Sequence, residues 1–136
     1  DGAPPPVDLA AERRNGDFVR HLIRTGALRC VHDLSDGGLA IAAAEMALAS
    51  GLGLTLDATS RARAHVLLFC EDQARYLVAT DAPEAVVAAA LQAGVNVAPV
   101  GLAGGDAFAS TGLFSLPLAA LREAHEGWMP RYMGET

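Results

Sequence analysis

The sequence contains no lysine, and all ten of its basic residues are arginine. A mechanism that needs a catalytic lysine in this chain is therefore excluded, as is a Walker-type phosphate loop, which requires one. The ten basic residues stand against 16 acidic ones and leave a net charge of -6. Such a chain has no clustered basic face for nucleic acid or for an anionic membrane. No apolar run reaches the roughly 18 residues of a membrane-spanning helix.

Cysteine is also scarce. The chain has only Cys30 and Cys70, and both lie in apolar runs typical of strands. Neither the basic n-region nor the apolar h-region of a secretory signal follows the start of the chain. Two cysteines without such a signal predict reduced, buried thiols in a cytoplasmic protein.

The start of the chain has the composition of a linker. It begins at Asp1 without an initiator methionine and then passes through Pro4, Pro5 and Pro6. Runs of proline are typical of the spacers between domains. We therefore predict that residues 1–7 are a linker from an upstream domain. The remaining residues, 8–136, then form one domain of a longer protein, with 51% hydrophobic residues in the chain to supply a core.

Helical and strand-like segments alternate after this start. Asp8 is placed to cap a helix that turns Leu9, Phe18, Val19, Leu22 and Ile23 toward a core. Gly104 to Asp106 is typical of a hairpin turn. We predict helices over 9–25, 39–49, 83–93 and 116–125, and strands over 28–32, 52–56, 65–69, 75–80 and 95–102. The alternation indicates an α/β (α+β) fold, a layered sandwich with a mixed sheet flanked by helices.

One polar segment joins a predicted strand to a predicted helix. It contains His32, Asp33, Ser35, Asp36, Gly37 and Gly38. A glycine-containing loop at a helix start can direct free backbone N–H groups at a phosphate. The two aspartates offer oxygen ligands to Mg²⁺, and the histidine can donate to an anion or move a proton. The same residues would equally serve as a helix cap and a tight turn.

A second polar segment, Glu71 to Tyr76, lies between two predicted strands. Glu71 and Gln73 are two residues apart, so they share one face if the segment is extended. That arrangement suits a polar ligand with several hydroxyl or amide groups. Alternatively, Glu71 and Arg75 form a solvated ion pair that contributes little.

In this order and spacing, the two segments closely resemble the large subunit of the phosphoribosylformylglycinamidine synthase family. The opening Gly2 to Leu9 and the segment Glu12 to Gly16 also resemble the beginning of the last domain of those enzymes. The resemblance implies a C-terminal domain of the AIR-synthase-related type. It covers the chain from about residue 2 to residue 134. The family usually has glycine or serine where this chain has Cys70.

The resemblance also implies a function. Enzymes of the family are ATP-dependent C–N ligases of purine biosynthesis that use Mg²⁺. They convert formylglycinamide ribonucleotide to its amidine with ammonia from glutamine. Their ATP-binding lysines and main metal carboxylates belong to upstream domains of the same chain, so this chain alone is expected to be inactive. In the short bacterial form, the glutaminase and a small third subunit are separate partners. Neither nucleic acid nor a membrane is expected to bind.

The resemblance places the candidate site residues at a cleft for a nucleotide or ribonucleotide substrate. They are His32, Asp33, Ser35, Asp36, Gly37, Gly38, Glu71 and Gln73. Two other interpretations stay open on the sequence. The domain could be structural, with a degenerate nucleotide site, or it could belong to a paralogue such as AIR synthase itself or a thiamine-phosphate kinase.

Overall fold

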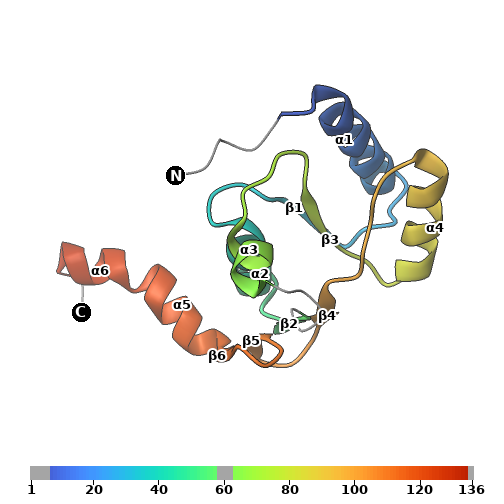
Figure 1. Cartoon of the computed structure of the whole chain (residues 1–136). Helices are drawn as coiled ribbons and strands as arrows, with labels where there is room; N and C mark the ends of the chain where they lie inside the picture. The colour runs from blue at the N-terminus through green and yellow to red at the C-terminus, as the bar shows by residue number, and fades with distance from the viewer. Residues whose placement is uncertain (1–6, 58–62, 135–136) are drawn as a thin grey trace. The chain divides into compact units, whose positions relative to one another are not determined.

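The computed structural model describes residues 7–57 and 63–134 (Figure 1). Most of the predicted linker, residues 1–6, therefore lies outside the described residues. The chain divides into two compact units, one built from residues 1–43 and 63–99 and the other from residues 44–62 and 100–136. The helix α2, Gly38–Ser50, belongs to the first unit up to Ala43 and to the second from Ala44.

The first unit is built on two helices and a pair of strands. The helices α1, Leu9–Arg24, and α4, Pro83–Ala93, lie side by side (Figure 1). A buried cluster joins them. The strands β1, Cys30–Asp33, and β3, Tyr76–Ala79, pair antiparallel. A short helix, α3, Ala64–Phe69, precedes β3. The cluster contains Phe18, Leu22, Val86, Ala90 and Val95.

Both long helices of this unit end in the same way. The N–H of Gly26 donates to Ile23, and the N–H of Ala27 donates to Leu22, five residues earlier. Gly26 has a φ of +71°, which glycine adopts without strain. In α4 the N–H of Val95 likewise donates to Ala90 across a left-handed Gly94. Each helix end therefore turns the chain back onto the buried cluster.

The second unit contains a mixed sheet in the order β4-β2-β5-β6. Its strands are β2, Leu54–Leu56, β4, Gly101–Ala103, β5, Ala107–Ser110, and β6, Phe114–Pro117. β2 is antiparallel to β4 and parallel to β5. The helices α5, Leu118–Glu126, and α6, Trp128–Met133, follow β6. The predicted mixed α/β fold is confirmed.

Several predicted elements are confirmed, with shifts of a few residues. Asp8 caps α1, because its carboxylate accepts hydrogen bonds from the N–H groups of Ala10 and Ala11 at 3.0 Å. Pro83 begins α4, and Gly94 ends it. In α1, however, Leu9 and Ile23 are exposed rather than in the core.

Three predicted elements are wrong. Residues 65–69 lie in the helix α3, because a short apolar run does not distinguish a strand from a helix. Of the predicted strand over 95–102, only Gly101 and Leu102 lie in a strand, β4, and Val95 instead completes the end of α4. Gly104 to Asp106 does not form a hairpin turn, because β2 lies between β4 and β5. At the C-terminus, residues 114–117 form β6, and the predicted last helix begins at Leu118.

The prediction for the cysteines is partly confirmed. Both thiols are free, as predicted. Neither is buried, however: Cys30 is exposed and Cys70 is half-buried. Within the residues described, no helix is both long and apolar enough to span a membrane.

Candidate functional site

The β1–α2 loop, residues 34–37, closes with a tight turn. The carbonyl of Ser35 accepts a hydrogen bond from the N–H of Gly38 at 3.0 Å. Gly37, the third residue of this turn, has a φ of +82°. A type II turn requires a positive φ at that position, which glycine adopts readily. The sequence Ser-Asp-Gly-Gly therefore determines the turn that begins α2.

Gly38 brings the start of α2 against the end of α3. A Cβ atom on Gly38 would lie 2.8 Å from the carbonyl oxygen of Cys70 and 2.9 Å from the carbonyl carbon of Phe69. Neither backbone atom can move away easily, because Phe69 is the last residue of α3 and Cys70 caps that helix. Only glycine permits this approach, which places residues 34–38 beside residues 69–71.

Two hydrogen bonds then join the β1–α2 loop to the α3–β3 turn, residues 70–75. The N–H of Gly37 donates to Oε1 of Glu71 at 2.8 Å. The N–H of Leu34 donates to the carbonyl of Arg75 at 3.0 Å. The two polar segments singled out in the sequence therefore form one continuous structure.

The ion pair between Glu71 and Arg75, an alternative left open by the sequence, is replaced by other contacts among the described residues. Glu71 accepts the N–H of Gly37, and the guanidinium of Arg75 donates to the carbonyl of Cys70 at 3.2 Å. Both side chains thus bind backbone groups and hold the turn in shape.

A cavity of about 290 Å³ lies over these two segments. Five of the eight candidate residues line it, and all five have exposed side chains. Because these residues are exposed, the cavity resembles one wall of a site rather than an enclosed pocket. The five residues are Asp33, Ser35, Asp36, Glu71 and Gln73.

The other three candidate residues do not line this cavity. Gly37 and Gly38 shape the backbone beneath it. His32 is half-buried, and its Nδ1 atom lies 2.6 Å from the carbonyl oxygen of Asp33. Sequence reasoning did not select Glu12, Arg75 or Tyr76, which also line the cavity. Glu12 reaches it from α1, a helix distant in sequence. The segment Glu12 to Gly16 contributed to the family resemblance, but it did not indicate a place at the site.

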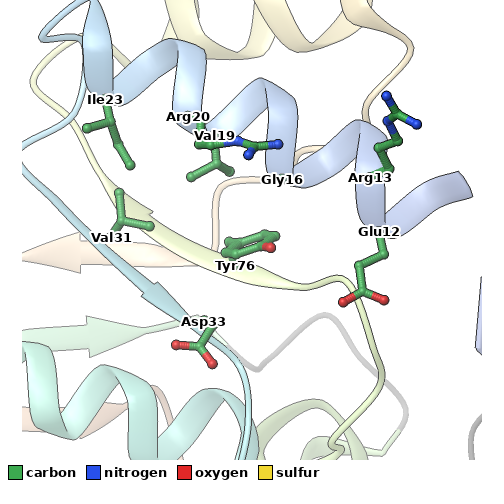
Figure 2. A pocket seen from close by; sticks show the side chains of 9 residues that line it. All are labelled: Glu12, Arg13, Gly16, Val19, Arg20, Ile23, Val31, Asp33 and Tyr76. Carbon is green, nitrogen blue, oxygen red and sulfur yellow. The ribbon is translucent and has the colours of Figure 1, made fainter. Parts of the chain in front are cut away.

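A second cavity, of about 580 Å³, lies between α1 and the β1–β3 pair. It shares Glu12, Asp33 and Tyr76 with the first. Figure 2 shows Ile23 of α1 pointing toward Val31 of β1, with the ring of Tyr76 beneath the helix. The two cavities therefore differ in character, one polar and one with an apolar floor.

Two backbone N–H groups of the expected phosphate cradle are used within the fold. The N–H of Gly37 is bonded to Glu71 and the N–H of Gly38 to Ser35, so neither is free for a ligand. Four carboxylates line the polar cavity against a single arginine. Among residues 7–57 and 63–134, no group of three or more His, Cys, Asp or Glu side chains is placed to hold a metal. The arrangement offers hydrogen-bond acceptors rather than an anion site.

Cys70 begins the α3–β3 turn, and its carbonyl oxygen faces Gly38. Asp72 raises the pKa of the thiol, mainly through a hydrogen bond that favours its protonated form, and desolvation acts in the same direction. The thiolate therefore forms only at a higher pH than for an ordinary cysteine.

The family of the chain follows from comparison with known proteins. The model of the AIR synthase related protein, C-terminal domain, matches residues 1–110. The chain belongs to this family of domains.

Its relatives are larger proteins. The phosphoribosylformylglycinamidine synthase subunit PurL of Caulobacter vibrioides is 64% identical over 133 residues, which cover 98% of this chain and 18% of that protein. The same subunit of Methylocella silvestris is 53% identical over 134 residues, 97% of this chain and 18% of that protein. The chain thus spans about a fifth of these relatives. The resemblance inferred from the two polar segments is confirmed.

Solved structures show the same fold. Thermotoga maritima PurL complexed with ATP matches 89% of this chain and 23% of that chain, with a TM-score of 0.76 and 17% identity. The same protein complexed with FGAR gives a TM-score of 0.72 at 16% identity, over the same shares of the two chains.

The close approach at Gly38 predicts a specific loss of stability. We expect Gly38→Ala to lower the free energy of unfolding by more than about 2 kcal/mol, because left-handed strain and a backbone clash act together. Gly26→Ala is the matched control, since its φ is also positive but nothing lies within 4 Å of the added Cβ. It should lose only about 1 kcal/mol. Urea denaturation measures both, and equal losses would contradict the close approach.

The pKa of Cys70 predicts slow alkylation. In a Cys30→Ser background, where Cys70 is the only thiol, Asp72→Asn should lower this pKa and speed reaction with iodoacetamide near about pH 8. Asp81→Asn is the control, because Asp81 pairs with Arg29 instead. If Asp72→Asn leaves the alkylation rate unchanged, Asp72 does not determine the reactivity of this thiol.

Proposed function

We propose that the chain is the C-terminal AIR-synthase-related domain of a phosphoribosylformylglycinamidine synthase. The whole enzyme is then a cytoplasmic, ATP-dependent C–N ligase of purine biosynthesis. It converts formylglycinamide ribonucleotide to formylglycinamidine ribonucleotide with ammonia from glutamine. The observation that carries this proposal is the 64% identity to a PurL subunit over 98% of the chain.

In this proposal the polar cavity forms one wall of a cleft that receives a ribonucleotide. Its side chains are rich in acceptors, and the hydroxyl and amide groups of such a ligand are donors. Asp36 and Gln73 are exposed and line the cavity from opposite segments, so they are the side chains best placed to meet a ligand. Since these side chains are exposed, a second surface must cover the ligand to exclude water. We assign that surface to an upstream domain of the same polypeptide.

ATP and Mg²⁺ are assigned to upstream domains as well. The N–H groups of Gly37 and Gly38 are used within the fold, and the chain has no lysine to bind phosphate. Thermotoga maritima PurL has been solved in complex with ATP, which supports nucleotide use by the whole enzyme. Asp33 and Asp36 have the oxygen chemistry for Mg²⁺ carried by a bound phosphate, although they form no metal site of their own.

The partners in this proposal are a glutaminase subunit and a small third subunit. The solved structure of PurLQS from Thermotoga maritima, whose PurL-like chain shares this fold, supports such an assembly. Ammonia would come from the glutaminase, and this domain would contribute only to holding the ribonucleotide.

One observation favours a structural role for part of the site. The carboxylate of Glu71 is already bonded to the N–H of Gly37, so it holds the two segments together whether or not a ligand binds. None of the hydrogen bonds described uses the carboxylate of Asp36 to hold the fold together. A substitution of Asp36 therefore tests ligand binding better than one of Glu71.

The proposal predicts that the 136-residue chain alone is inactive. With ATP, Mg²⁺, ammonia and formylglycinamide ribonucleotide supplied, we expect no turnover, because the groups that bind phosphate lie elsewhere. A chimera should restore activity when this chain replaces the matching segment of the Caulobacter vibrioides subunit. Turnover by the chain alone, or an inactive but folded chimera, would contradict the proposal.

Substitutions of cavity residues distinguish a role in ligand binding from a role in the stability of the fold. In the active chimera, Asp36→Ala should lower kcat/KM by about tenfold or more without changing the thermal midpoint, since a charged acceptor is lost. Glu71→Ala should lower the thermal midpoint as well, because the N–H of Gly37 loses its partner. Glu84→Ala, an exposed carboxylate in the first turn of α4, is the control. Unchanged kinetics for Asp36→Ala would mean that the cavity is structural.

A further inference from the structure

Asn15 and Gly16 stand in the middle of α1, where they weaken the helix. Asparagine and glycine are poor helix formers, and neither residue caps an end of this 16-residue helix. Such residues in a helix interior indicate a contact that the helix must make at that point. Both lie where α1 passes the α3–β3 turn, and a Cβ atom on Gly16 would lie 3.4 Å from the hydroxyl of Tyr76.

The contact that Asn15 makes is with Ala74. Its Nδ2 atom donates to the Ala74 carbonyl at 2.9 Å, across 59 residues of sequence, and the bond is partly buried. Because a carbonyl only accepts, the amide nitrogen must face it. An aspartate of the same shape could not make this bond. The Oδ1 atom of Asn15 is buried and has no hydrogen-bond partner among the described residues. The side chain therefore bonds to Ala74 through Nδ2 and leaves its own oxygen unpaired.

Ala74 is held in an unusual conformation. Its φ is +62°, and it is the one residue other than glycine with a positive φ in the described part of the chain. An alanine rarely adopts this left-handed conformation, which is strained unless its surroundings impose it. The residues on either side, Gln73 and Arg75, both line the polar cavity. A relaxed Ala74 would redirect both side chains.

We propose that Asn15 is a positioning residue for the polar cavity. Its amide holds the carbonyl of Ala74 in the left-handed conformation, and so aims Gln73 and Arg75 at the ligand. The inference rests on the proposed function, because it concerns the same cleft. It gives α1 a role in ligand binding, although α1 lies outside both polar segments.

The test uses the active chimera described above. Asn15→Ala should raise the KM for formylglycinamide ribonucleotide by about three- to tenfold, the effect of losing one hydrogen bond, with little change in kcat. Hydrogen exchange in the segment 71–76 should become faster. Adding Ala74→Gly should return the KM toward that of the parent, because glycine adopts the left-handed conformation without strain. This recovery would not follow if Asn15 only stabilised the fold.

Two further variants keep the test decisive. Asn15→Leu keeps nearly the same shape without the donor and favours the helix, so it should reproduce the effect even if Asn15→Ala folds poorly. Arg14→Ala, an exposed neighbour that does not line the cavity, is the control and should leave the KM unchanged. An unchanged KM in both Asn15 variants, or no recovery with Ala74→Gly, overturns the inference. The proposed function of the domain survives that result, because it is tested by the activity of the chimera. The role of the cavity in ligand binding survives if Asp36→Ala still lowers kcat/KM, and it fails if Asp36→Ala has no effect either.

Discussion

The backbone contact between Gly38 and the end of α3 is the constraint on which the candidate site depends. It leaves no room for a Cβ atom, and it brings the two polar segments within hydrogen-bond distance. The bond from Gly37 to Glu71 and the bond from Leu34 to Arg75 then fix the segments against each other. The polar cavity is the surface that results, so its shape follows from two glycines and from the side chain of Glu71 that bonds to one of them.

The charge of this surface limits what it can do. Its acidic side chains and its internally bonded glycine N–H groups suit a ligand that donates hydrogen bonds, and they do not suit bare phosphate. The chain also has no lysine, which agrees with the assignment of phosphate binding to other domains. In the proposed enzyme, this domain accepts hydrogen bonds from the ribonucleotide, and other domains neutralise the phosphates.

Sequence reasoning succeeded where a local rule acts alone and failed where distant contacts decide. The cap at Asp8 and the ends of α4 at Pro83 and Gly94 depend on neighbouring residues, and all were predicted. The run at 65–69 has no periodicity that separates a helix from a strand. The pairing of β4 with β2 rather than with β5 depends on how the whole sheet assembles. Residues of the two polar segments were found from their composition, whereas Glu12 and Asn15 reach them from a distant helix.

The sequence by itself determined the polar segments, the turn that begins α2, the family of the domain and the absence of a lysine for phosphate. These follow from residue types and short spacings. The tertiary structure alone decided that the N–H of Gly37 is bonded to Glu71, that five candidate side chains share one cavity, and that Asn15 bonds to Ala74. These depend on contacts across 34 to 59 residues, and no local pattern encodes such distances because the chain must first fold to create them.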